Sequence, residues 1–325
     1  MRGIVVENPG RGHRLIVAEV PRPQPGAGQV LVEVAAAGVN RADLLQARGA
    51  YPPPAGASEL LGLECSGTIA EVGAGVEGWS IGDRVAALLP GGGYAQYAVA
   101  DAACVFPVGG AMDLADAAAA PESICTVWSN LIEAGYKAGG PLLAHGGAGG
   151  IGSMAIRLGT ALGSPVFATA GGAERARACQ ALGAVRGIDY RSEDFVQVVL
   201  EETESRGVDV IIDVVGAPYL ERNLRALAVG GTVAVIGLMG GAVAELDLAR
   251  MLSQRHRVMA TNLRGRSRAE KALIGRRVRS DVWDQVASGP AGPLIGARLP
   301  MSEAESAHAL MRAGSVVGKI LLVWD

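Results

Sequence analysis

The chain has 325 residues, a formal net charge of −3 at pH 7 and hydrophobic residues at 50% of its positions. This length suits two domains with separate cores, and the hydrophobic share argues against a disordered chain. The mixed charges argue against binding to nucleic acid or to a membrane surface. No apolar run is long enough to predict a membrane span, and an early acid and proline argue against a signal peptide. The four cysteines are widely spread, which favours buried free thiols in a cytoplasmic protein.

Residues 1 to about 120 predict a β-rich domain, because short apolar runs are separated by glycine and proline turns. From about residue 121 strands and helices alternate. The predicted strands are 141–145, 165–169, 208–214 and 232–237, and the predicted helices are 150–162, 173–182 and 218–227. This alternation is typical of a doubly wound parallel sheet, so the predicted fold class is α/β.

After about residue 263 the sequence predicts an arginine-rich helix over 268–287, a short helix over 302–313 and a final strand over 318–325. We expect this tail to return to the β-rich domain and complete it. The predicted domains are therefore 1–120 together with 264–325, and 121–263 between them.

The turn before the helix 150–162 holds a dinucleotide-binding motif. Gly147, Gly149 and Gly152 satisfy G-x-G-x-x-G, directly after a strand and directly before a helix. Glycines let the backbone approach a pyrophosphate, and the start of the helix directs N–H groups at it. The alternative is an ordinary strand–helix turn that needs glycine for packing.

The residues after the second strand of this unit favour NADP(H) over NAD(H). No acid follows the strand 165–169 until Glu174, so the usual partner of a ribose 2′-hydroxyl is missing. Arg175 and Tyr190 could instead bind a 2′-phosphate. Arg175 could also be an ordinary exposed helix residue, and Tyr190 could be a packing residue at a strand end.

The sequence predicts no metal site. The four histidines are far apart, and the cysteines lack the spacing of zinc ligands. We expect His145, which precedes the glycine turn, to pack or to form hydrogen bonds there. The predicted chemistry is metal-free hydride transfer, polarised by hydrogen bonds.

A set of short segments along the chain matches a known pattern: 38–43, 61–67, 81–85, the glycine turn, 169–171 and 318–320. Together they resemble those of the medium-chain dehydrogenases/reductases, and the resemblance covers essentially the whole chain. The segments 40–54, 88–93 and 237–241 narrow the match. Within that superfamily the chain is similar to the zinc-free, zeta-crystallin-type quinone oxidoreductases, and closest to their tumour-suppressor-inducible type.

The resemblance implies a GroES-like catalytic domain built from both chain ends, with a Rossmann domain inserted between them. Zinc-binding members carry cysteine and histidine where this chain has Arg41 and Leu63. The family also suggests a homodimer formed through edge strands near 233–237 and 257–261. Family members often have serine and lysine where Gly172 and Arg175 stand here, which softens the expected preference for NADP.

The resemblance also implies the site residues. It places Asn40 and Tyr51 in the catalytic cleft, as donors to the substrate oxygen. Asn40 could equally be the N-cap of a helix over 41–47, with Asp43 completing a capping box. The predicted cofactor contacts are Thr126, Gly147, Ala148, Gly149, Gly150, Ile151, Gly171, Gly172, Arg175, Tyr190, Val215, Gly237, Leu238, Met239 and Lys319.

The predicted function is NADPH-dependent, metal-free reduction of quinones. Reduction of the C=C bond of enals or enones is the alternative, because both reactions deliver a hydride to a conjugated carbonyl compound. A non-enzymatic role, structural or in RNA binding, is a third possibility against which the negative charge weighs. The physiological substrate and the choice between one- and two-electron transfer stay open.

Overall fold

A computed structural model describes residues 1–10 and 12–324 and contains two compact units. Unit 1 comprises Met1–Cys125 and Arg264–Asp325, and unit 2 comprises Thr126–Leu263. Helix α2 (Pro121–Glu133) begins in unit 1 and ends in unit 2, so unit 2 starts a few residues after the predicted boundary. The catalytic and cofactor-binding roles of the two domains stay predictions.

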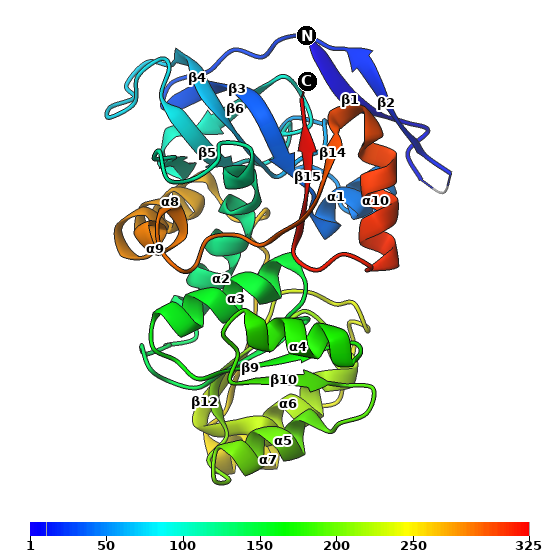
Figure 1. The fold of residues 1–325 in the computed structure, drawn as a ribbon, viewed down its shortest axis with the longest axis vertical. Coiled ribbons are helices and arrows are strands. Elements are labelled where there is room, and N and C mark those ends of the chain that lie inside the picture. Colours follow the sequence, from blue (N-terminus) through cyan, green and yellow to red (C-terminus); the bar gives the residue numbers. More distant parts are fainter. Residues whose placement is uncertain (11, 325) are drawn as a thin grey trace. The chain divides into compact units, whose positions relative to one another are not determined.

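Unit 2 is built on a parallel sheet of six strands in the order β10-β9-β8-β11-β12-β13, and the predicted α/β class is confirmed. Figure 1 shows α3 and α4 over one face of this sheet and α5, α6 and α7 over the other. Since both faces are covered, the central strands β8 and β9 are buried along their whole length. The elements are β8 (Leu142–His145), α3 (Gly150–Ala161), β9 (Val166–Ala170), α4 (Ala173–Ala181), β10 (Arg186–Asp189), α5 (Phe195–Glu202), β11 (Val208–Asp213), α6 (Leu220–Ala226), β12 (Leu227–Val235), α7 (Leu248–Gln254) and β13 (Arg257–Ala260).

One expectation about the edge of this sheet is wrong. The family resemblance places residues 233–237 at an edge, but β12 pairs with β11 on one side and with β13 on the other. Val233 faces Val258 and Val235 faces Ala260, so the backbone of β12 is already used within the chain. Among the described strands of this sheet, β13 and β10 form the edges.

Unit 1 contains a seven-stranded sheet in the order β14-β15-β3-β4-β5-β7, with β6 also paired to β3, and a separate hairpin of β1 and β2. The predicted return of the tail is confirmed, because β15 pairs with β3 in the register Leu321 to Gly38. The elements are β1 (Arg2–Glu7), β2 (Arg14–Glu19), β3 (Gln29–Gly38), α1 (Arg41–Ala47), β4 (Glu64–Val72), β5 (Arg84–Leu88), β6 (Tyr97–Asp101), β7 (Val105–Pro107), α8 (Arg268–Asp281), α9 (Trp283–Ala287), β14 (Ile295–Pro300), α10 (Ala304–Ala313) and β15 (Lys319–Val323).

The helix predicted over 268–287 is interrupted at Val282, which has φ −139° and separates α8 from α9. The interruption lets Trp283 turn inward. Its indole N–H donates to the carbonyl of Pro107 at 2.8 Å, and its ring stacks on Phe106 with centroids 4.6 Å apart. Burial of this large aromatic side chain outweighs continuation of the helix.

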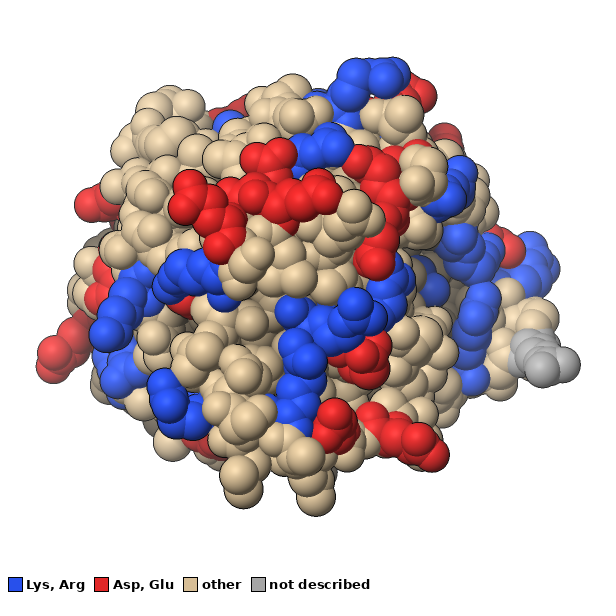
Figure 2. Space-filling view, turned by 90° about the horizontal axis from the view of Figure 1, so that it is seen from below, with Lys and Arg blue, Asp and Glu red and all other residues tan. Residues whose placement is uncertain are grey.

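All four cysteines are free and buried, as the sequence predicts. Figure 2 shows basic and acidic side chains interspersed over the face that it displays. Within residues 1–10 and 12–324, no helix combines the length and the apolar character that crossing a membrane requires.

Candidate functional site

The glycine turn of unit 2 lies between β8 and α3 and leaves no room for a side chain at Gly147 or Gly152. The N–H of Gly147 donates to the carbonyl of Thr169 at 2.8 Å. A Cβ on Gly147 would lie 2.7 Å from the sulfur of Cys179, and a Cβ on Gly152 would collide with the carbonyl of Gly146. These positions therefore require glycine, and the backbone at the start of α3 is open to close approach by a ligand.

His145 sits beneath this turn in a buried hydrogen-bond network. The amide nitrogen of Asn223 donates to Asp213 at 3.1 Å, so its oxygen faces His145. The Nε2–H of His145 therefore donates to Asn223 at 2.7 Å, and its Nδ1 accepts from the hydroxyl of Thr169 at 2.9 Å. Burial lowers the pKa of His145 to about 4, so the ring is neutral near pH 7. The expectation that His145 forms hydrogen bonds here is confirmed.

The end of β9 forms a second part of this surface. Gly172 has φ +99°, and its N–H donates to the carboxylate of Asp189 at 2.8 Å. Bonds from the N–H groups of Gly172 and Arg191 lower the pKa of Asp189. The Tyr190 hydroxyl would lie 2.6 Å, and Arg191 Nε 3.5 Å, from a Cβ on Gly171. A phenol and a guanidinium therefore border this turn.

Arg191 is absent from the predicted contacts, although it directly follows Tyr190. Its place beside the glycines makes it a second basic candidate. The predicted base, Arg175, lies half-buried in the first turn of α4. Sequence spacing favours Arg175, whereas the fold brings Arg191 to the turn from β10, a neighbouring strand in the sheet.

The loops that follow β11 and β12 contact each other at the carboxyl ends of the strands, where the glycine turn after β8 also lies. The N–H of Met239 donates to the carbonyl of Val214 at 3.2 Å, and a Cβ on Gly237 would lie 3.0 Å from that oxygen. Leu238 and Met239 are more than half exposed. The predicted residues Val215, Gly237, Leu238 and Met239 are thus neighbours at the carboxyl ends of the strands, where ligands of such sheets bind.

Of the remaining predicted contacts, all but Lys319 belong to unit 2. Ala148, Gly149, Gly150 and Ile151 lie at or beside the start of α3, and Thr126 is buried in α2. Lys319 lies in unit 1, at the start of β15.

In unit 1, Lys319 forms a buried cluster with Asn40 and Glu64. The ammonium group is ion-paired with Glu64 and donates to the Asn40 oxygen at 2.7 Å. The Asn40 amide nitrogen donates to Glu64 at 2.8 Å and to the carbonyl of Gly38 at 3.4 Å. Lys319 and Glu64 side chains are 4% and 0% exposed, so the protein itself satisfies this cluster. A direct contact between Lys319 and a cofactor stays a prediction.

Asn40 is also the N-cap residue of α1, whose bounds match the predicted helix. Its backbone N–H donates to Asp43 at 2.7 Å. Asp43 is fully buried and also accepts from the N–H of Gly62 and the hydroxyl of Tyr94, both at 3.1 Å. Burial outweighs these bonds and raises the pKa of Asp43 to about 6. The capping interpretation of Asn40 and its place in the polar cluster are therefore compatible.

Tyr51 is held by an arginine that sequence reasoning missed. Arg264 is 5% exposed, and its guanidinium carbon lies 5.3 Å from the centroid of the Tyr51 ring. It donates to the carbonyls of Pro90 at 2.9 Å and Tyr51 at 3.4 Å, and to the side-chain oxygen of Gln46 at 2.7 Å. Burial lowers the pKa of Arg264. In a chain rich in arginine, no sequence signal distinguishes this one.

Glu122, in the first turn of α2, is the second missed residue. Its N–H donates to the second carboxylate oxygen of Glu64 at 2.9 Å. Burial and the charge of Glu64 raise the pKa of the Glu122 carboxyl to about 8, while Lys319 and Arg264 oppose the shift. In the sequence, an acid after Pro121 resembles an ordinary first-turn residue.

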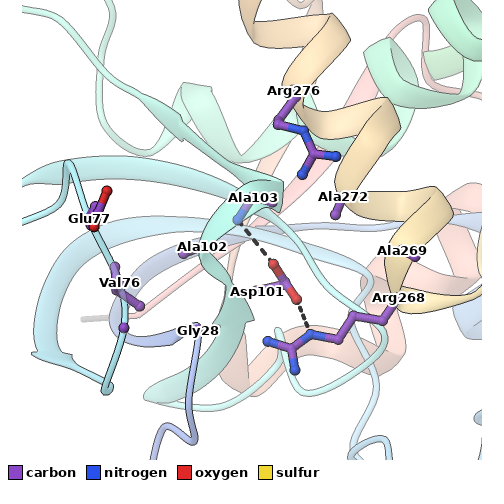
Figure 3. Close-up of a pocket in the computed structure, with 11 residues that line it drawn as sticks. Gly28, Val76, Glu77, Asp101, Ala102, Ala103, Arg268, Ala269, Ala272 and Arg276 are labelled. Carbon is purple, nitrogen blue, oxygen red and sulfur yellow. Dashed lines mark hydrogen bonds and ion pairs between the residues drawn. The ribbon is translucent and has the colours of Figure 1, made fainter.

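Unit 1 also contains a cavity that lies away from the predicted site residues. This cavity, of about 530 Å³, is bordered by β6 and α8, where Arg268 pairs with Asp101 (Figure 3). None of the predicted site residues lines it. In the part of the chain that the structure describes, no three His, Cys, Asp or Glu side chains are grouped to hold a metal ion. The metal-free chemistry stays a prediction.

Comparison with known proteins identifies the family. The model of the "Alcohol dehydrogenase GroES-like domain" matches residues 26–110, and that of the "Zinc-binding dehydrogenase" matches residues 150–276. A mycobacterial quinone oxidoreductase structure is 30% identical, covers 99% of both chains and has a TM-score of 0.86. Escherichia coli quinone oxidoreductase in complex with NADPH is 28% identical over 99% of both chains, with a TM-score of 0.84.

Other relatives are an enoyl reductase and a polyketide synthase. The CurK enoyl reductase structure is 26% identical, covers 100% of this chain and 99% of its own, and has a TM-score of 0.86. A phenolphthiocerol/phthiocerol polyketide synthase polypeptide of Mycobacterium tuberculosis is 31% identical over 98% of this chain. The chain spans only 14% of the length of that synthase polypeptide. From the full-length matches, the chain belongs to the medium-chain dehydrogenase/reductase superfamily and is of the quinone-oxidoreductase type.

Proposed function

We propose that the chain binds NADPH in unit 2 and reduces quinones without a metal ion. The observation that carries this proposal is the carboxyl edge of β8 and β9. There a turn that requires glycine at positions 147 and 152 adjoins a second turn, which Tyr190 and Arg191 border. Backbone N–H groups suit a pyrophosphate, and a phenol with a guanidinium suits a 2′-phosphate. The similar Escherichia coli enzyme, whose structure contains NADPH, supports the same cofactor.

Each part of the cofactor has candidate partners in this unit. Residues 147–151 would bind the pyrophosphate, and Gly171, Gly172, Arg175, Tyr190 and Arg191 would surround the 2′-phosphate. Val215, residues 237–239 and Thr126 would border the nicotinamide. The bound cofactor supplies a hydride from its C4 atom.

Tyr51 is the donor that we propose for the substrate oxygen. Three prolines directly follow Tyr51 in its loop, and Arg264 contacts its backbone carbonyl and its ring. A hydrogen bond from the phenol would stabilise the negative charge that hydride transfer leaves on the oxygen. The donor role predicted for Asn40 requires that its long bond to Gly38 be given up, because its other amide hydrogen is directed at Glu64.

Substitution of Tyr51 tests this assignment. Tyr51→Phe removes the donor and should lower turnover roughly tenfold or more. The affinity for NADPH, followed by fluorescence titration, should stay unchanged because Tyr51 is not among the proposed cofactor contacts. Unchanged turnover would remove Tyr51 from the mechanism.

Reduction of an enal or enone is the second candidate reaction. It is favoured by the similarity to CurK enoyl reductase and to polyketide synthases. Assays with a naphthoquinone and an alkenal, side by side and with NADPH or NADH, separate the candidates. Turnover of the quinone with NADPH is the expected result. Faster reduction of the alkenal would establish the second reaction, and equal affinity for NADH would contradict the cofactor preference.

We also propose that two copies associate through β13, in a cytoplasmic protein. The outer edge of β13 lacks a paired strand among the described residues. Apolar side chains in the segment that precedes β13 are strongly exposed, with Val243 at 91%, Leu252 at 83% and Leu248 at 68%. Exposed apolar groups beside a sheet edge are typical of an association surface.

A further inference from the structure

An acid lies beside the turn that we propose for the 2′-phosphate, although no acid directly follows β9 in the sequence. Asp189 ends β10, which pairs with β9 in the sheet, and it faces Ala170 at the end of that strand. Its carboxylate oxygen Oδ1 accepts from the N–H of Gly172 at 2.8 Å. In sites of this kind the acid is usually found after the second strand of the unit. Here the fold brings one to the same turn from the neighbouring strand.

Bonds within the chain hold this carboxylate in place. The same oxygen, Oδ1, also accepts from the N–H of Arg191 at 3.1 Å. The backbone N–H of Asp189 donates to Glu193 at 2.9 Å, and Glu193 is in turn ion-paired with Arg186. Gly172 has φ +99°, a conformation that favours glycine, and so directs its N–H at the acid. Asp189 is therefore a fixed part of the turn.

The charge of Asp189 partly offsets that of the base beside it. Arg191 Nε lies 3.5 Å from a Cβ on Gly171, and Arg191 Nη1 lies 3.7 Å from a Cβ on Gly172. The bonds from the N–H groups of Gly172 and Arg191, together with the Arg191 charge, lower the pKa of Asp189, so the carboxylate is ionised at pH 7. At this turn Asp189 and Arg191 therefore present opposite charges.

The two forms of the cofactor differ in charge at the position proposed for this turn. NADPH carries a 2′-phosphate where NADH carries a neutral hydroxyl, so a carboxylate repels the first group and not the second. We propose that Asp189 limits the preference of the site for NADPH by opposing the charge of the 2′-phosphate. This inference rests on the proposed function, because it requires the 2′-phosphate at this turn. Tyr190 and Arg191 favour NADPH, and Asp189 reduces that advantage.

Asp189→Asn isolates the charge, because the side-chain oxygen of asparagine can still accept from both N–H groups. In fluorescence titrations of the full chain, this variant should bind NADPH roughly tenfold more tightly than the wild type does. Its affinity for NADH should stay close to that of the wild type. Asp189→Ser also removes the charge and should shift the ratio of the two affinities in the same direction. Glu202→Gln, which removes a charge at an exposed site of α5, should match the wild type.

The dependence on salt separates an effect of charge from an effect of shape. Repulsion is screened at high ionic strength, so the difference between Asp189→Asn and the wild type should shrink as salt is added. An unchanged ratio of the two affinities in Asp189→Asn overturns the proposal and leaves the proposed function intact. An equal gain for NADPH and NADH also overturns it, because a general change of the turn would then be the cause. If the wild type binds neither cofactor, the proposed function fails, and the role of Asp189 fails with it.

Discussion

Arg264 shows how one side chain can organise several segments. Its guanidinium connects Gln46, Pro90 and Tyr51 in the interior of unit 1, and all three acceptors are uncharged oxygens. A lysine ammonium is a point charge and cannot span acceptors arranged around a planar fork. Arg264→Lys should therefore lower the free energy of unfolding by about 2 kcal/mol and slow turnover.

Denaturant unfolding measures this effect, and Arg277→Lys at an exposed site is the control. The control should stay close to the wild type because it removes no buried contact. If both variants lost the same free energy of unfolding, the buried contacts of Arg264 would not contribute to stability.

The histidine beneath the glycine turn predicts a dependence of stability on pH. The pKa of His145 is about 4 in the fold against 6.5 for an unperturbed imidazole. Between these values the unfolded chain binds more protons, so stability falls as pH is lowered from about 6.5 towards 4, by about 3 kcal/mol in total. His145→Gln should show a shallower fall in urea unfolding between pH 7 and 5.

The pKa values of His256 and His308 are lowered too, and both residues stay in the variant. The difference between variant and wild type therefore isolates His145. Parallel pH profiles for the two proteins would contradict the assignment.

Individual site residues differ in how far the sequence reveals them. The glycines of the turn could be predicted, because strand, turn and helix are contiguous and the constraint is local. Arg264 and Glu122 could not, since their roles come from Tyr51, Glu64 and other partners far away in the chain. Asn40 is intermediate: its capping role is local, whereas its bond to Lys319 joins residues 279 positions apart.

At the scale of elements, the pair of Glu64 and Lys319 fastens β15 to β4 across a separation of 255 residues. β15 and β4 both flank β3, so the pair links the two neighbours of that strand. Lys319→Met leaves the buried carboxylate of Glu64 unpaired, and should lower the free energy of unfolding by about 3–5 kcal/mol.

The double variant Glu64→Gln with Lys319→Met should recover part of this loss, because no buried charge then stays unpaired. Lys137→Met, at an exposed position, is the control. Denaturant unfolding of the wild type, Lys319→Met, the double variant and Lys137→Met measures these differences. If Lys319→Met were as stable as the wild type, the ion pair would not hold the two strands together.

Elements were predictable where a pattern is long and uniform. The strands β8, β9 and β11 follow the expected ranges closely, since burial on both faces selects mostly apolar residues. The alternation does not predict α5, whose β-branched residues resemble a strand, and it misses the interruption between α8 and α9. There the cause is the contact of Trp283 with β7, which no local pattern contains.

For the whole molecule, the return of the chain was predictable, but its pairing partner was not. A final apolar strand must join some sheet, and the expectation that it joins the β-rich one agrees with the resemblance to the dehydrogenase family. The register of β15 on β3 depends on contacts between the two ends of the chain. The dimer interface could not be predicted from the sequence for the same reason, because the edge expected at residues 233–237 is in fact covered by β13.

We therefore expect two copies of the chain to associate through the exposed edge of β13. Sedimentation of the wild type should give about twice the 33.1 kDa mass of one chain. Leu252→Glu combined with Val258→Lys puts charges on the apolar surface and on the edge strand, which opposes strand pairing between copies. This variant should sediment as a monomer, whereas Ile81→Glu, at a 70% exposed position in unit 1, should not change the mass. A dimer that survives the paired substitution must form through another surface.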